Sequence, residues 1–325
     1  MDYLFLLSGE NVELAKEEVL SLIKYKNYFL KKRLLVIKTN KKLNGIEERL
    51  AFTHRIYLLL FESNLKNLIK NIENFDWKTI YKKDFCVRIN NSNNKIKKKY
   101  NEKKLASYIW KKLKNPRVNL ENPKTLIEFY FLKDKVYCGL LIKKIEKDFE
   151  KRKAHLRPEF SPTSLHPKLA RALVNLTGIK KGKILDLFCG TGGILIEGGL
   201  MGLIPIGFDN NKMMLKKCKK NLNYFKIKKY KLKLQDATKI NEKHNYIVAD
   251  LPYGKSSPSE DKNLNHLYYN LLKNLKKNIG KRAVIVFPDF IYYKKLVKKS
   301  KLIIENQFSV YIHKSLTKKI LVLKK

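Results

Sequence analysis

The chain has 325 residues, which is longer than most single domains, so we expect more than one domain. It carries 71 lysines and arginines against 29 acidic residues, a formal net charge of +42. Such a charge favours polyanionic partners, nucleic acid first, unless an AT-rich genome alone has inflated the lysine content. No apolar run approaches the roughly 18 residues of a membrane span and no signal-peptide pattern opens the chain, so we expect a cytoplasmic protein without a membrane partner.

The four cysteines are Cys86, Cys138, Cys189 and Cys218. They form no C-x-x-C pair and have no histidine at metal-ligand spacing, so we predict buried thiols and no metal site. None lies near the candidate base-binding motif at residues 250–254. This position argues against reactions in which a thiolate attacks a pyrimidine ring.

The first 64 residues predict a small α/β subdomain of ferredoxin-like type. Residues 3–7 and 33–37 have strand character, and residues 12–23 have helical spacing. His54 and Arg55 follow a predicted helix and are interpreted as surface or capping residues. No residue of this segment suggests catalysis.

A second unit is predicted from residue 65 to 146. It contains a strand at residues 85–89, a polar loop at 90–99, a basic helix with apolar positions Leu105, Ile109 and Leu113, and strands at 126–131 and 136–142. With the P-x-V-x-L-x-x-P pattern at 116–123, this order resembles the THUMP domain, an RNA-binding module. The resemblance implies that the basic helix and loop hold structured RNA through its phosphates. The alternative is a solvated basic helix on an ordinary α+β domain.

Residues 147–166 are predicted to be a basic linker, and residues 167–325 a third domain with a nucleotide-type pocket. Residues 183–188 predict a buried strand, and Gly190-Thr-Gly-Gly193 predicts a turn before a helix. A dinucleotide site would need a further glycine at Leu195. The D-x-F-x-G-x-G pattern at 186–192 instead resembles the first motif of class I S-adenosylmethionine-dependent methyltransferases.

That resemblance implies S-adenosylmethionine as cofactor, a cationic sulfonium that suits carboxylates at strand ends. Asp209 ends the second predicted strand and can accept hydrogen bonds from ribose hydroxyls. Asp236 follows the third and can accept the adenine amino group, although a helix cap explains it equally well. The candidate cofactor-binding residues are Thr163, Leu165, Asp186, Phe188, Gly190, Thr191, Gly192, Gly193, Asp209, Asn210, Asp236, Ala237 and Asp250.

The candidate catalytic residues are Asp250, Leu251, Pro252 and Tyr253, which follow the fourth predicted strand at 245–249. An exocyclic amine is a poor nucleophile because its lone pair is delocalised into the base. The Asp250 carboxylate and the Leu251 carbonyl can accept hydrogen bonds from the two N–H groups of this amine, and Tyr253 can stack on a flipped base. The segment resembles the D/N-P-P-Y/F motif of amino-group methyltransferases, with leucine in place of the first proline.

Together with P-T-S-L-H-P at 162–167 and D-L-P-Y-G-K-S-S at 250–257, these motifs are similar to those of the archaeal tRNA guanosine-10 N2-methyltransferases. The family implies a Rossmann-like α/β domain with a seven-stranded mixed sheet, a tRNA partner, and mono- or dimethylation of guanine N2. We also expect a monomer, although no residue pattern determines the oligomeric state. Three alternatives stay open: guanosine-6 methylation, where the motif usually begins with asparagine; an amino-methyltransferase acting on DNA adenine or protein glutamine; and a non-catalytic RNA-binding protein with a vestigial pocket.

Overall fold

The computed structural model describes residues 1–43, 45–90, 94–133, 135–146, 148–162, 164–253, 258–314 and 316–325. The chain forms two compact units, each with its own seven-stranded sheet. The first unit contains residues Met1–Val12, Lys24–Glu47 and Thr53–Glu146, and the second contains Glu13–Ile23, Glu48–Phe52 and Lys147–Lys325. Within the described residues, no helix has the length and apolar character needed to cross a bilayer.

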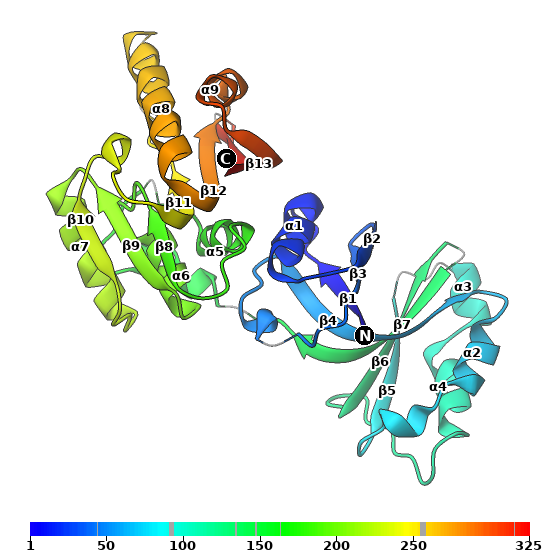
Figure 1. The fold of residues 1–325 in the computed structure, drawn as a ribbon. Coiled ribbons are helices and arrows are strands. Elements are labelled where there is room, and N and C mark those ends of the chain that lie inside the picture. The colour runs from blue at the N-terminus through cyan, green and yellow to red at the C-terminus, as the bar shows by residue number, and fades with distance from the viewer. Residues whose placement is uncertain are drawn as a thin grey trace. The chain divides into compact units, whose positions relative to one another are not determined.

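The sheet of the first unit has the strand order β2-β3-β1-β4-β7-β6-β5. Helices α2 and α4 contact each other, and their apolar residues share a core with the strands (Figure 1). The strands are β1 (Asp2–Leu7), β2 (Asn27–Lys31), β3 (Leu34–Lys38), β4 (Thr53–Asn64), β5 (Phe85–Asn90), β6 (Thr125–Leu132) and β7 (Lys135–Lys144), and the helices are α2 (Leu68–Asn74), α3 (Asn94–Lys99) and α4 (Glu102–Trp110). The predicted boundary at residues 64 and 65 therefore lies at the end of β4, inside one unit.

Two local predictions for this unit are wrong. His54 and Arg55 do not follow a helix but lie in β4, which pairs with β1 and β7. Arg55 forms an ion pair with Glu128, whose side chain is fully buried in β6 and also accepts a hydrogen bond from Asn90. Residues 94–99 form helix α3, although the sequence predicted a loop there. The lysine-rich composition indicated exposure, which a surface helix shares with a loop.

The sheet of the second unit has the order β10-β9-β8-β11-β12-β14-β13. The first five strands are parallel, whereas β14 is antiparallel to both β12 and β13. This arrangement confirms the predicted mixed seven-stranded Rossmann-like sheet. The strands are β8 (Lys183–Asp186), β9 (Ile204–Asp209), β10 (Lys231–Leu234), β11 (His244–Asp250), β12 (Ile279–Pro288), β13 (Ile303–His313) and β14 (Leu316–Lys324).

Helices cover this sheet in two groups that contact each other within the group: α5, α6 and α7, and separately α8 and α9 (Figure 1). Parallel strands need such crossover helices, and the apolar faces of strands and helices form the core. The helices are α1 (Val12–Leu22), α5 (Pro167–Leu176), α6 (Gly193–Leu200), α7 (Lys212–Tyr224), α8 (Pro258–Asn278) and α9 (Tyr293–Ser300).

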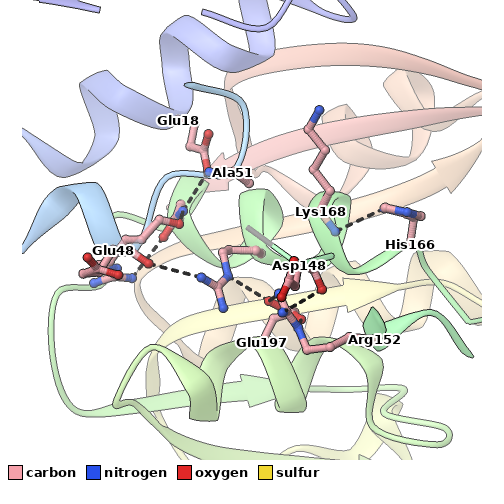
Figure 2. Close-up of polar contacts among 11 residues, drawn as sticks. Glu18, Glu48, Ala51, Asp148, Arg152, His166, Lys168 and Glu197 are labelled. Carbon is pink, nitrogen blue, oxygen red and sulfur yellow. Dashed lines mark hydrogen bonds and ion pairs between the residues drawn. The ribbon is translucent and has the colours of Figure 1, made fainter. Parts of the chain in front are cut away.

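Two short segments from the start of the chain belong to the second unit. The buried Glu18 carboxylate of α1 accepts hydrogen bonds from the backbone N–H groups of Ala51 and Phe52, both at 2.8 Å, and from Asn175 Nδ2 of α5 at 2.7 Å. Figure 2 shows Glu18 directed toward Ala51. Burial raises the pKa of Glu18, and these donors partly offset that effect. The network ties α1 to α5, the helix that precedes β8, the strand that carries Asp186.

The predicted linker also lies in the second unit and contains two 3-10 helices, η3 (Glu150–Arg152) and η4 (Ala154–Leu156). Arg152 Nε lies 2.7 Å from Glu197 Oε1, and Arg171 Nε lies 2.7 Å from Glu197 Oε2 (Figure 2). Glu197 is fully buried in α6. One carboxylate thus fixes the linker and α5 to the helix that follows the glycine turn.

Candidate active site

A cavity of about 510 Å³ lies where the parallel strands of the second unit end. Ligands of open α/β sheets bind at this edge, because the loops after the strands converge there. Of the predicted residues, the cavity is lined by Leu165, Asp186, Phe188, Gly190, Thr191, Gly193, Asp209, Asn210, Asp236, Ala237, Asp250, Leu251, Pro252 and Tyr253. Gly192 is not among the lining residues, and Thr163 lies outside the described residues.

The glycine turn between β8 and α6 depends on two left-handed backbone positions. Gly190 has φ +49° and Gly192 has φ +89°, values that residues with a side chain rarely adopt. A Cβ atom at Gly192 would also lie 2.7 Å from Cys218 Sγ. Gly192 therefore shapes the turn by close approach to α7, while its neighbours line the cavity.

Gly193 makes room for an arginine. A Cβ atom there would lie 3.2 Å from a terminal nitrogen of Arg157, which is 5% exposed. Arg157 Nε donates to the Arg152 carbonyl at 2.9 Å, while its two terminal nitrogens have no hydrogen-bond partner in the described part of the chain. Burial lowers the pKa of Arg157, and nearby Glu197 opposes that shift. No motif in the sequence connects Arg157 with the turn.

Two carboxylates hold the strand ends of the cavity. Asp186 is 1% exposed and accepts a hydrogen bond from Phe188 N at 3.2 Å. Burial, together with the charges of Asp250 and Asp209, raises the pKa of Asp186 to about 8, although the Phe188 hydrogen bond opposes the shift. Asp209 Oδ2 accepts from Gly190 N at 2.8 Å and Oδ1 from Asn211 N at 2.9 Å. The second strand end is thereby tied to the glycine turn.

Asp236 lines the cavity and also caps a helix. Its Oδ1 atom accepts hydrogen bonds from the backbone N–H and the hydroxyl of Thr238, at 2.8 and 2.7 Å, at the start of η5 (Ala237–Lys239). The capping alternative for this residue is therefore present in the structure. It occurs together with a position on the cavity wall.

The motif at residues 250–253 lies at the end of β11. Asp250 Oδ2 is 2.6 Å from Lys318 Nζ, and Oδ1 is buried without a hydrogen-bond partner in the described ranges. Burial raises the pKa of Asp250, and the Lys318 ammonium opposes this shift. The Pro252 carbonyl accepts a hydrogen bond from the Tyr268 hydroxyl of α8. The turn is thus fixed by a helix and by a strand distant in sequence.

Sequence motifs did not reveal several residues of this site. Lys318 is the clearest case, since it lies 68 positions from Asp250 and belongs to no motif. Ser164 also lines the cavity, and its hydroxyl is 3.1 Å from the Thr191 hydroxyl. It lies within the motif at 162–167, between the candidates Thr163 and Leu165, but was not itself predicted. Cys189, Met214 and Gln235 complete parts of the wall. Cys189 and Gln235 directly adjoin predicted residues, so adjacency was the only available signal.

Comparison with known proteins agrees with this geometry. The family described as "RMKL-like, methyltransferase domain" matches residues 154–318, and the THUMP domain family matches residues 62–141. The tRNA (guanine(10)-N2)-dimethyltransferase of Methanothermobacter thermautotrophicus is 32% identical over 86% of this chain and 84% of its own length. The enzyme of the same name from Pyrococcus abyssi is 36% identical over 85% of each chain.

The chain belongs to the tRNA (guanine(10)-N2)-dimethyltransferase family. The predicted family and the predicted THUMP and methyltransferase domains are confirmed. A tRNA (guanine(6)-N2)-methyltransferase of Methanocaldococcus jannaschii is 25% identical over 95% of this chain. Among solved structures, TrmN from Thermus thermophilus covers 100% of both chains with a TM-score of 0.51 and 17% identity, a likeness in fold alone.

Proposed function

We propose that this protein transfers methyl groups from S-adenosylmethionine to the exocyclic N2 of guanosine 10 in tRNA. The observation that carries the proposal is the Asp250 carboxylate on the cavity wall, with one buried oxygen that lacks a donor in the described residues. A buried acceptor without a partner requires an explanation, and an N–H group of a bound base provides one. Family membership supports the tRNA and the position.

The residues around the cavity fit S-adenosylmethionine. The cavity has a volume of about 510 Å³, which lies in the usual range for a cofactor site. Asp186, Asp209 and Asp250 provide carboxylates for a cationic ligand, and the glycine turn allows close backbone approach. Asp209 would accept from the ribose hydroxyls and Asp236 from the adenine amino group. When bound, S-adenosylmethionine supplies a methyl group activated by a sulfonium.

The chain's own residues prepare the amine. Asp250 and the Leu251 carbonyl each accept a hydrogen bond from one N–H group of the amine. These two hydrogen bonds counteract delocalisation of the nitrogen lone pair and orient the nitrogen. Tyr253 offers a ring on which the extruded guanine stacks. Once methylated, the amine is strongly acidic, so even a carboxylate paired with an ammonium is basic enough to receive its proton. Leu251 itself is 1% exposed in the hydrophobic core, so only its backbone is assigned this role.

The first unit is proposed to bind the tRNA. Lys103, Lys104, Lys111 and Lys112 are exposed on and just after α4, while Leu105 and Ile109 of the same helix are buried. An exposed row of lysines on a fixed helix suits contacts with phosphates, which position RNA without reading its sequence. We infer further that the enzyme acts as a monomer in the cytoplasm and without a metal ion.

Transfer of labelled methyl to unmodified tRNA transcripts tests the proposal, with the product nucleoside identified and its position mapped. N2-methylated guanosine at position 10 is expected, and label at position 6 would move the substrate assignment to that of the guanine(6) relative. Tight tRNA binding without labelling would favour a non-catalytic RNA-binding protein.

Asp250→Ala tests the central residue of the proposal. We expect this variant to lose methyl transfer while retaining tRNA binding, because the acceptor for the amine is gone. Asp289→Ala is the matched control, since Asp289 is exposed just after β12 at the same edge of the sheet. Near-normal turnover in the Asp250 variant would contradict the assigned role.

A further inference from the structure

Lys318 is a buried lysine that reaches the catalytic motif from the far side of a strand. Its residue is 3% exposed, and its ammonium lies 2.6 Å from Asp250 Oδ2 and 5.0 Å from the ring centroid of Tyr253. These distances place one cation against two of the four residues proposed to handle the base.

The sheet topology explains how the lysine reaches this point. Asp250 of β11 pairs with Val286 of β12, which pairs with Ile320 of β14. Lys318 lies two residues before Ile320 and is opposite Pro288, the last residue of β12. Because β14 runs antiparallel to β12, its beginning lies at the edge where β11 ends. Strands β11 and β14 lie on either side of β12, each about 4.8 Å from it. The lysine side chain therefore crosses the end of β12 to reach Asp250.

The environment of Asp250 makes this ion pair important for its charge state. The titratable groups coupled to Asp250 are Lys318 of β14, which acts on it, and Asp186 of β8 and Tyr268 of α8, on which its charge acts; Tyr253 lies in the same turn. Lys318 is the cationic member of this set and lowers the pKa of Asp250, whereas burial favours the protonated acid. A protonated Asp250 would present an O–H donor where the amine requires an acceptor.

We propose that Lys318 is a positioning residue of the methyl transfer, which holds Asp250 Oδ2, keeps the carboxylate ionised and leaves Oδ1 for the amine of the substrate. This inference rests on the proposed function of Asp250. The same ammonium lies over the ring of Tyr253 and thereby fixes the acceptor and the stacking ring relative to each other. Lys318 touches neither the donor nor the base in this role.

The pH profile of single-turnover methyl transfer tests the proposal. In Lys318→Met the Asp250 pKa should rise, so the acidic limb of the rate profile should move to higher pH by about one unit or more. At pH values below the acidic limbs of both proteins, the rate of Lys318→Met should be lower than that of the wild type by about tenfold for each unit of displacement. At alkaline pH the two rates should become similar. Lys318→Arg keeps the charge and should keep the limb close to that of the wild type.

Lys319→Met is the matched control. Lys319 is the next residue of β14, where alternate side chains point to opposite faces, and its ammonium contacts Ser309 Oγ at 3.0 Å. Its profile should match that of the wild type. Binding of S-adenosylhomocysteine, measured by calorimetry, and circular dichroism report whether each variant is folded.

The outcomes separate the two hypotheses. A Lys318→Met profile with an unmoved limb, or with an equal rate loss at every pH, would overturn the positioning role. If Lys318→Met does not fold, the Lys318→Arg variant decides. An acidic limb displaced by about one pH unit or more in this variant, although the positive charge is kept, would overturn the positioning role. An unmoved limb would support it. Absence of methyl transfer by the wild-type enzyme would refute the proposed function itself.

Discussion

Replacing Asp186 with asparagine should stabilise the second unit, and the gain should increase with pH. Asp186 is 1% exposed, and its pKa is raised from 3.8 to about 8, first by burial and then by the neighbouring Asp250 and Asp209. Between these values the folded state keeps a proton that the unfolded chain has lost. The free energy of unfolding therefore falls as pH rises from about 4 to 8. Asparagine has no charge and escapes this loss.

The magnitude follows from the displacement of the pKa. At about 1.4 kcal/mol per pKa unit, the full cost of ionising Asp186 in the folded state is on the order of 6 kcal/mol above pH 8. At pH 7 the loss is about 4 kcal/mol, and near pH 4 it vanishes. The stability difference between Asp186→Asn and the wild type should follow this curve.

The assay must report the second unit alone. Both tryptophans, Trp77 and Trp110, lie in the first unit, so their fluorescence does not follow the unit of interest. Amide hydrogen exchange of peptides from β8 and β11, compared between variant and wild type at the same pH, gives the required difference. A difference that stays constant between pH 5 and pH 8 would refute the raised pKa. Above pH 8, where Asp186 of the wild type is ionised, the variant should also bind S-adenosylhomocysteine more weakly, because the carboxylate is absent.

Two further substitutions, one in each unit, test buried contacts. Glu197→Gln should destabilise the second unit by about 3 kcal/mol, because the guanidinium groups of Arg152 and Arg171 lose their shared buried carboxylate. Hydrogen exchange of α6 measures this, and Glu159→Gln, whose partner Lys220 is exposed, should change it little. Gly139→Ala should cost roughly 1–3 kcal/mol in the first unit, since its Cβ would lie 2.9 Å from Tyr57 Cβ. Tryptophan fluorescence in denaturant follows this loss; a variant as stable as Gly9→Ala, where the nearest atom is 3.6 Å away, would contradict the clash.

The sequence determined the parts of the protein that are local. The segment of β8, the glycine turn and α6 were predictable because a buried strand, residues needing positive φ and a helix follow one another without interruption. Parallel strand ends converge at one edge, so the order of the strands along the chain was enough to predict that Asp186, Asp209 and Asp250 lie together. The cavity lining agrees with this expectation.

Tertiary structure decided which distant residues complete these elements. The apolar run of β4 fits a buried helix or a buried strand equally well, and pairing with β1 and β7 makes it a strand. Helix α1 has an apolar face, but only the fold shows that its Glu18 bonds to Asn175, 157 residues away. Lys318 is one of many lysines in the sequence. It reaches Asp250 only because β14 pairs with β12 in the sheet, next to β11. Local patterns specify an element and its buried face, whereas the partner of a buried charge depends on chain topology.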